Sequence, residues 1–415
     1  MKTGQKNRQF NNNHFFETSS FIEEACGVVL FLYLISLFMF SYIEGLNIIS
    51  NGLAGLFVFL VIINILAKRR KIVITKFIFE YLLFIFACQI SFFIAVDKQL
   101  VLTKVLTLIQ LFVIAFALIN YLNSFFKIER FFGYYTIASF IASIYILLEA
   151  DLANPDRIGE NLGNVNTIGI IIAVSIVFCL YFIIEKRNIL VLPVLLINTT
   201  VVALTGSRMA FIFIAVAVFV LFIQYYRNLK RNKVALIAAT AIIAAFLIYL
   251  VFNVPILYSV IGKRIQNLVS FTMGESVREN SVYIRWDMLQ KGVGWFFQKP
   301  LFGYGIDNFR VLYGSIEGGL ETYSHNNIVE LLVGIGLVGT TIFYYMLCSA
   351  LHKLVCVRIH KFKGLQFSMI AILAAYLVAS AGSVYYYSKL FTILLTVSVI
   401  LFVQYNTMEY KIYGK

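Results

Sequence analysis

Hydrophobic residues occur along this chain in long runs that charged residues and turn residues separate. A bilayer core about 30 Å thick requires roughly 20 apolar residues per helix. Runs of suitable length predict twelve membrane-spanning helices, at residues 26–43, 46–67, 74–96, 100–122, 131–149, 166–184, 189–204, 207–226, 234–252, 326–350, 366–382 and 389–404. The expected fold class is therefore an all-α polytopic membrane protein with about 12 transmembrane helices.

The connections between these runs are short, except for one segment of 73 residues at 253–325. The predicted organisation is a cytoplasmic tail (1–25), helices 1–9 (26–252), a large outer loop (253–325), and helices 10–12 with a short cytoplasmic tail (326–415). A structureless loop of this length is uncommon in a compact protein. We therefore expect the loop to carry short interfacial helices, one of them around 282–293, followed by turns at Lys299-Pro300 and Gly303-Tyr304-Gly305.

Composition and charge agree with a membrane protein. Apolar residues make up 61% of the chain and charged residues 13%, whereas soluble domains average roughly 45–50% and about 25%. The net charge of +14 would suggest a nucleic-acid partner in a soluble domain. However, 22 of the 34 basic residues fall in segments predicted to lie on the same side of the membrane as the N-terminus. Lys and Arg are enriched in cytoplasmic loops. The basic excess therefore reflects topology, with both termini cytoplasmic and no nucleic acid expected.

The sequence gives little indication of a signal peptide, disulfides or bound metal. No apolar stretch precedes the first predicted helix, so we expect that helix to remain as an anchor. None of the five cysteines lies in a predicted outer loop, and none has CxxC spacing. Zinc-protease HExxH, Walker lysine and Asp-x-Asp motifs are also lacking. We expect no cofactor and no metal, so arginine and lysine would have to neutralise a bound phosphate.

Three outer features could carry chemistry. Arg208 follows a Gly206-Ser207 turn between two helices, and Arg285 precedes Trp286 in the large loop. A guanidinium can bind phosphate through two parallel hydrogen bonds, although an interfacial or solvated arginine is an equally good interpretation of each. His325, in Ser324-His325-Asn326-Asn327, is the single histidine of four that is predicted to face outward. It could accept a proton near neutral pH, or it could simply help to cap the tenth helix.

Glycines in the tenth predicted helix match the dinucleotide-binding motif GxGxxG, but the match is misleading. Gly334, Gly336 and Gly339 satisfy GxGxxG, but they lie within an apolar span with no strand before them. The dinucleotide-binding interpretation requires that strand. Close packing through small residues is the better explanation.

These motifs, in this order, resemble the O-antigen ligase and polysaccharide polymerase (Wzy-type) family. The resemblance rests on Gly206-Ser207-Arg208, on Arg285-Trp286, on the Lys-Pro-Leu-Phe-Gly-Tyr-Gly stretch at 299–305, and on Ser324-His325-Asn326 before the glycine-containing helix. Arg157-Ile158-Gly159, followed by Gly163-Asn164-Val165-Asn166, resembles a further motif of the family. Lys299 stands where the family often has histidine, which leaves the turn intact.

The resemblance implies a glycosyltransferase C-like membrane fold and transfer of a glycan from undecaprenyl pyrophosphate to an acceptor hydroxyl, without metal and with inversion. It places the site at the outer face of the bacterial cytoplasmic membrane. Residue by residue, it implies that Arg208 and Arg285 hold the pyrophosphate and that His325 is the general base; Arg157, Tyr304 and Asn326 are further substrate-binding candidates. The implied partners are lipid-linked donor and acceptor glycans, membrane lipid, a chain-length regulator and a flippase.

The leading hypothesis is a repeat-unit polymerase for capsule, O-antigen or exopolysaccharide. A ligase of the same family, which moves finished polymer to another acceptor, fits the motifs equally well. A flippase for lipid-linked oligosaccharides is the alternative from a different class. It is disfavoured because, apart from Glu80, few charges lie at mid-membrane depth and because the large loop would be unexplained.

Overall fold

The structure is a computed structural model that describes most of the chain. It covers residues 21–41, 43, 45–150, 158–159, 162–228, 280–359 and 361–413, with isolated positions and short stretches between 233 and 270. The α-helices are α1 (Phe21–Met39), α2 (Asn47–Ala67), α3 (Lys76–Ile90), α4 (Lys98–Tyr121), α5 (Phe125–Leu148), α6 (Val165–Ile184), α7 (Leu192–Thr205), α8 (Arg208–Asn228), α12 (Asn280–Gln298), α13 (Phe309–Gly314), α14 (Asn327–Cys356), α15 (Lys363–Ala379) and α16 (Lys389–Tyr413). The described residues contain no strand.

The predicted fold class is confirmed. Among the described residues, nine helices are long and apolar enough to cross a membrane, and shorter apolar helices span Ile189–Thr205 and Lys363–Ala379. These helices coincide with eleven of the predicted spans. The ninth predicted span, 234–252, lies almost entirely outside the described residues. The count of twelve therefore stays a prediction.

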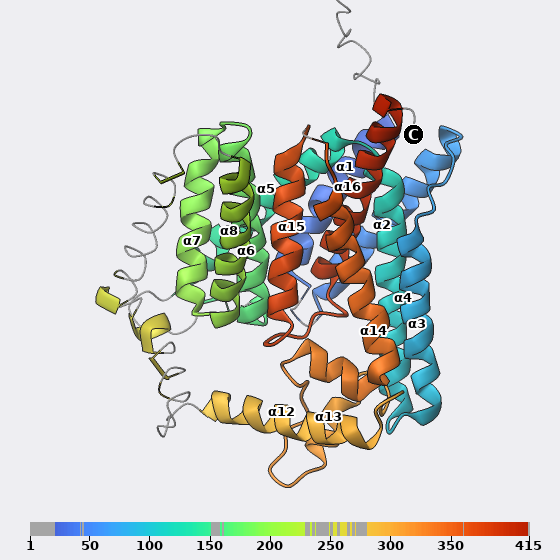
Figure 1. The fold of residues 1–415 in the computed structure, drawn as a ribbon, viewed down its shortest axis with the longest axis vertical. Helices are drawn as coiled ribbons and strands as arrows, with labels where there is room; N and C mark the ends of the chain where they lie inside the picture. The colour runs from blue at the N-terminus through green and yellow to red at the C-terminus, as the bar shows by residue number, and fades with distance from the viewer. Residues whose placement is uncertain are drawn as a thin grey trace, which may run out of the picture.

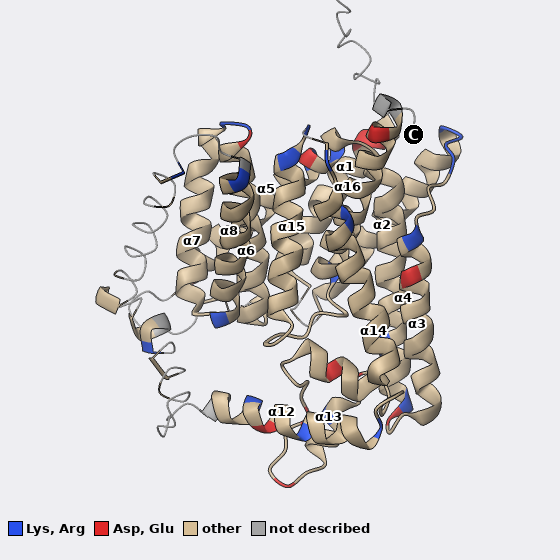
Figure 2. Cartoon of the chain, viewed as in Figure 1, with Lys and Arg blue, Asp and Glu red and all other residues tan. Residues whose placement is uncertain are grey.

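The membrane-length helices stand side by side, and α12 lies across one end of them (Figure 1). We call this the α12 end, and the opposite end, where α16 finishes, the C-terminal end. Helix α15 packs against α8, α14 packs against α3, and α12 packs against α14. Lys, Arg, Asp and Glu lie mostly near the two ends (Figure 2). This distribution is expected because a charge at the bilayer centre costs about 2.5–3.5 kcal/mol or more.

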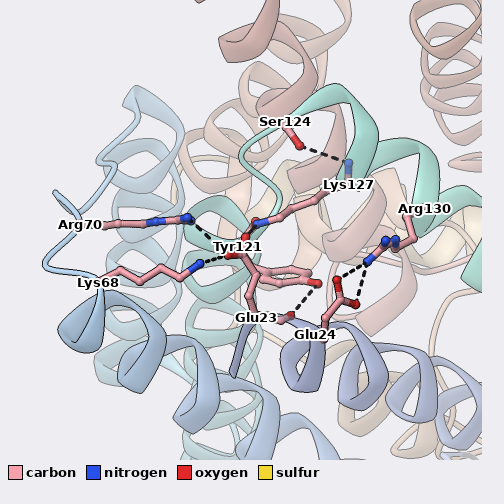
Figure 3. Close-up of polar contacts among 8 residues, drawn as sticks. All are labelled: Glu23, Glu24, Lys68, Arg70, Tyr121, Ser124, Lys127 and Arg130. Carbon is pink, nitrogen blue, oxygen red and sulfur yellow. Dashed lines mark hydrogen bonds and ion pairs between the residues drawn. The ribbon is translucent and has the colours of Figure 1, made fainter. Parts of the chain in front are cut away.

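The C-terminal end is held by ion pairs around Glu23 near the start of α1 (Figure 3). Glu23 is 7% exposed. Its carboxylate contacts Lys68 and Lys127, and it lies 3.4 Å from the Arg70 guanidinium. This group, the Glu23 cluster, joins α1 to the α2–α3 connection and to α5. Glu23 lies in α1 ahead of residue 26, where the first span was predicted to start.

At the α12 end, a bend in α14 receives the loop that follows α12. Gly336 has φ +64°, inside the helix. A Cβ on Gly336 would lie 2.3 Å from the backbone carbonyl of Leu301. The Tyr304 and Gly305 N–H groups donate to the Val333 and Gly334 carbonyls, each at 2.8 Å. Gly334 and Gly336 therefore permit close backbone packing of the large loop on α14, whereas Gly339 faces the side chain of Ile335 in its own helix. The small residues do allow close packing, but at Gly334 and Gly336 the partner is a loop and not the helix that the sequence indicated.

Candidate active site

His325 lies in a tight turn immediately before α14. Asn326 caps the helix, because its side-chain oxygen accepts hydrogen bonds from the N–H groups of Ile328 at 2.9 Å and Val329 at 3.1 Å. Capping therefore does not fall to His325, which is half-buried with φ +55°. Non-glycine residues seldom adopt this left-handed conformation, although histidine does so more often than most. The turn thus presents the imidazole in a fixed, mildly strained position.

The imidazole is packed against Tyr323, which connects it to α6. The two ring centroids are 4.3 Å apart, with the planes tilted by 51°. The Tyr323 hydroxyl accepts a hydrogen bond of 3.0 Å from the side-chain amide of Asn164, the residue that caps α6. The His325 turn is therefore attached to the beginning of α6 through an aromatic residue that sequence analysis did not select.

The charge of Arg285 on α12 affects the protonation of His325. Burial, and secondarily the positive charge of Arg285, lower the pKa of His325 from 6.5 to about 4. Burial also raises the pKa of Tyr323, against the opposing effects of Asn164 and Arg285. The charge of one predicted residue, Arg285, thus acts on another, His325. The imidazole is neutral at physiological pH, and its ring can accept a proton.

Arg208 begins α8 at the same end, beside the start of α6. Gly206 ends α7 in the left-handed conformation, with φ +59°, which glycine adopts at no steric cost. The Ser207 hydroxyl, fully buried, donates a hydrogen bond of 2.9 Å to the Asn166 side chain. Asn164 and Asn166 therefore link the first turn of α6 to the His325 side and to the Arg208 side. Arg208 itself is half-buried.

The other predicted site residues have different surroundings. Arg157 lies outside the described residues. Tyr304 is 8% exposed in a small hydrophobic cluster between α12, α13 and α14, and its hydroxyl donates to Gln298 at 2.9 Å. The Asn326 side chain is occupied in helix capping. Tyr304 and Asn326 therefore both have structural contacts within the chain, and their role in substrate binding stays a prediction.

A second group of charges behind the His325 turn was not selected from the sequence. Lys104 on α4 lies 3.4 Å from Asp307, and Arg310 lies 3.2 Å from the same carboxylate. The Lys104 ammonium also sits 3.6 Å from the centre of the Tyr387 ring. The available signal was a pair of ionisable residues inside apolar helices, Lys104 in α4 and Glu330 in α14, since such residues usually mark functional or tightly packed positions.

Together these residues form the candidate site at the α12 end. The charge of Arg285 acts on a neutral imidazole, and a second arginine, Arg208, begins α8 at the same end. A fixed cation stabilises charge that develops on a departing group, while the imidazole can accept a proton from an attacking hydroxyl. Among the described residues, no group of three or more His, Cys, Asp or Glu is placed to hold a metal ion.

The fold and site define a multi-pass helical membrane protein with a candidate base and cations at one end. Residues 193–344 match a family model described as O-antigen ligase, and this match confirms the resemblance indicated by the motifs. The matched stretch includes Arg208, Arg285 and His325 and does not reach Arg157. The similarity supports a polysaccharide-related, glycosyltransferase-like membrane protein. No curated protein matches the chain.

Proposed function

We propose that the protein is a polysaccharide repeat-unit polymerase. It transfers a growing glycan from undecaprenyl pyrophosphate to a hydroxyl of an acceptor repeat unit, with the α12 end at the outer face of the cytoplasmic membrane. The observation that carries the proposal is the effect of the Arg285 charge on a half-buried, neutral His325, inside the stretch that is similar to O-antigen ligases. The orientation follows from the enrichment of Lys and Arg in cytoplasmic loops.

The proposed reaction is a single displacement at the anomeric carbon. A ring nitrogen of His325 takes the proton of the acceptor hydroxyl, and the hydroxyl oxygen forms the new bond. The bond between the anomeric carbon and the pyrophosphate oxygen breaks, with inversion, and undecaprenyl pyrophosphate leaves. Arg285 and Arg208 bind the pyrophosphate, whose negative charge increases as that bond breaks, so the cations lower the barrier.

Donor binding also explains how an imidazole with a low pKa can act as the base. The positive charge of Arg285 is one of the two causes of the low pKa. A bound pyrophosphate would offset that charge, because an opposite charge nearby favours the protonated imidazole. The base therefore becomes stronger when the donor is in place. A positioned base of this kind contributes about 10²–10⁴-fold to a rate.

The test is incubation of the purified full-length protein in lipid with one defined undecaprenyl-pyrophosphate-linked repeat unit. We expect a ladder of longer lipid-linked glycans, formed at the same rate with and without EDTA. The ladder should disappear in His325→Ala at an equal amount of folded protein. A wild-type protein that never lengthens the repeat unit would overturn the polymerase proposal.

A ligase is the second candidate because the matching family model is described as O-antigen ligase. An assay that supplies preformed lipid-linked polymer together with a separate oligosaccharide acceptor distinguishes a ligase from a polymerase. Transfer of the whole polymer without lengthening of single units would identify a ligase. Translocation of labelled lipid-linked sugar across vesicles, with neither reaction, would instead favour a flippase.

A further inference from the structure

Glu330 is a buried carboxylate whose hydrogen bond reaches the His325 turn. It lies in the first turn of α14 and is 1% exposed. Its side-chain oxygen accepts a hydrogen bond of 2.8 Å from the backbone N–H of Ser324. A buried acceptor is seldom placed on an apolar helix without a partner that requires it, because removing a carboxylate from water is costly. The partner here is the residue immediately before His325.

The turn itself is closed around His325 by short contacts. The Ser324 hydroxyl donates to the Asn326 carbonyl at 2.8 Å, and the Asn326 N–H donates back to the Ser324 hydroxyl at 3.3 Å. The Asn326 carbonyl also accepts the N–H of Glu330 at 2.9 Å. Glu330 is therefore joined to both residues that flank His325. These contacts hold His325 in a backbone conformation that would otherwise relax.

Charged residues from other parts of the chain act on Glu330. The charges of Lys104 and Asp307 act on it, and Asp307 is itself bound by Lys104 and Arg310. These residues come from α4, from the loop after α12 and from α13; Lys104 attracts the Glu330 carboxylate and Asp307 repels it. Burial and the hydrogen bonds to Ser324 and Asn326 hold Glu330 against the turn, so it is not a surface residue that happens to be nearby.

We infer that Glu330 is a positioning residue for the transfer reaction: through the Ser324 N–H it fixes the turn that presents His325. The inference rests on the proposed function, in which His325 is the base. Glu330 touches neither substrate nor reacting atoms, and it acts by keeping the imidazole at the attacking hydroxyl. Misplacement of a reacting group by about 1 Å can cost a factor of 10².

The kinetic test compares Glu330→Gln and Glu330→Met in the lengthening assay. The amide oxygen of glutamine can still accept the Ser324 N–H, so Glu330→Gln should keep a turnover number within a few-fold of wild type. Methionine fills a similar volume but accepts only weakly, so Glu330→Met should lower kcat by about 10–10²-fold with little change in KM. Glu317→Met, at an exposed glutamate, is the matched control and should behave as wild type.

A double variant separates positioning of His325 from a general structural role. If Glu330 acts through His325, adding Glu330→Met to His325→Ala should cause no further loss, because coupled residues are not additive. A loss in the double variant equal to the product of the single losses would overturn the inference. So would an unchanged kcat in Glu330→Met.

A measurement that does not depend on activity tests the inference even if the proposed function is wrong. Replacing His14, His352 and His360 by Gln leaves His325 as the single histidine available to diethyl pyrocarbonate. In that background Glu330→Met should release the turn and raise the modification rate of His325 several-fold, whereas Glu330→Gln should not. Equal rates in all variants would overturn the inference, and failure of wild-type protein to lengthen the repeat unit would overturn only the proposed function.

Discussion

Basic residues lie at both ends of the helix bundle, but the group on which their charges act differs between the two ends. At the C-terminal end the central group is the Glu23 carboxylate, contacted by Lys68, Arg70 and Lys127 (Figure 3). At the α12 end it is the His325 imidazole, whose pKa is lowered to about 4 by burial and by Arg285. Cations around a carboxylate of the same chain form a clamp. A cation beside a neutral imidazole leaves a group that can accept a proton.

The comparison shows that clusters of lysine and arginine in a membrane protein cannot be interpreted by number alone. The Glu23 cluster joins the ends of three helical segments, so its function is to hold the bundle together. The arginines at the α12 end lie on α8 and α12. The first turn of α6 hydrogen-bonds to Ser207, which precedes Arg208, and to Tyr323, which packs against His325. Substitutions at one end should therefore change the transfer rate, and substitutions at the other should change thermal stability.

The largest effect should come from removing the base or its neighbouring cation. His325→Ala and Arg285→Ala are each expected to lower the rate of repeat-unit transfer by about 10²–10⁴-fold without lowering thermal stability. Lys127→Ala, at the other end, should keep the wild-type rate per folded molecule. The measurement is initial product formation by purified protein. Equal losses in all three variants would mean that the two ends do not differ in function.

Removal of Glu23 should give the opposite result. Glu23→Ala leaves Lys68, Arg70 and Lys127 clustered without their common carboxylate, and breaking a buried ion pair costs about 3–5 kcal/mol. The loss should be smaller here because the partner side chains remain 13–26% exposed. We expect a lower unfolding temperature, measured as the protein that stays monodisperse in detergent after heating. The transfer rate of the surviving protein should be unchanged; a selective loss of rate would contradict the clamp.

The sequence predicted the apolar spans because length and hydropathy alone determine them. It also predicted that Arg285 and His325 share one end of the molecule, since both follow from the topology of the large loop. It could not reveal that Asn326, and not His325, caps α14, or that Tyr304 is packed in a core. Those outcomes depend on side-chain contacts between segments far apart in the chain. Asn164 and Tyr323, which lie 159 positions apart, are another such contact.

The Lys104–Asp307–Arg310 group and Glu330 were missed for a related reason. None of them was given a chemical role from the sequence, and Asp307, next to the 299–305 motif, lies in a turn that could have been solvated. The structure brings them together because the loop after α12 folds against the bend at Gly336. Ionisable residues inside predicted spans were the one signal that composition offered.

A smaller effect should result from exchanging arginine for lysine at each end. Lysine keeps the charge but lacks the planar fork that binds phosphate through two hydrogen bonds. Arg285→Lys should therefore lower the transfer rate about tenfold, a loss of about 1.4 kcal/mol in transition-state binding. Arg70→Lys should leave both rate and unfolding temperature near wild type, because Glu23 needs only a nearby positive charge. A full rate for Arg285→Lys would indicate that the guanidinium geometry is not used.

The smallest effect should be the dependence of His325 reactivity and of folding stability on pH. In the single-histidine protein, diethyl pyrocarbonate reacts with neutral imidazole, so its rate should fall through a midpoint near pH 4. Because this pKa lies below the ordinary value of 6.5, the unfolded chain binds the proton first as pH falls. With respect to His325, the folded state should therefore be most stable above about pH 6.5 and should lose stability between pH 6.5 and 4.

Two arginine variants test whether Arg285 contributes to that midpoint. Arg285→Gln should move the midpoint upward but not to 6.5, since burial is the larger cause of the low pKa. Arg208→Gln is the matched control, because Arg208 is not among the causes of the shift. An unchanged midpoint in Arg285→Gln would show that the charge of Arg285 does not act on His325. The contrast between the two ends would then no longer hold.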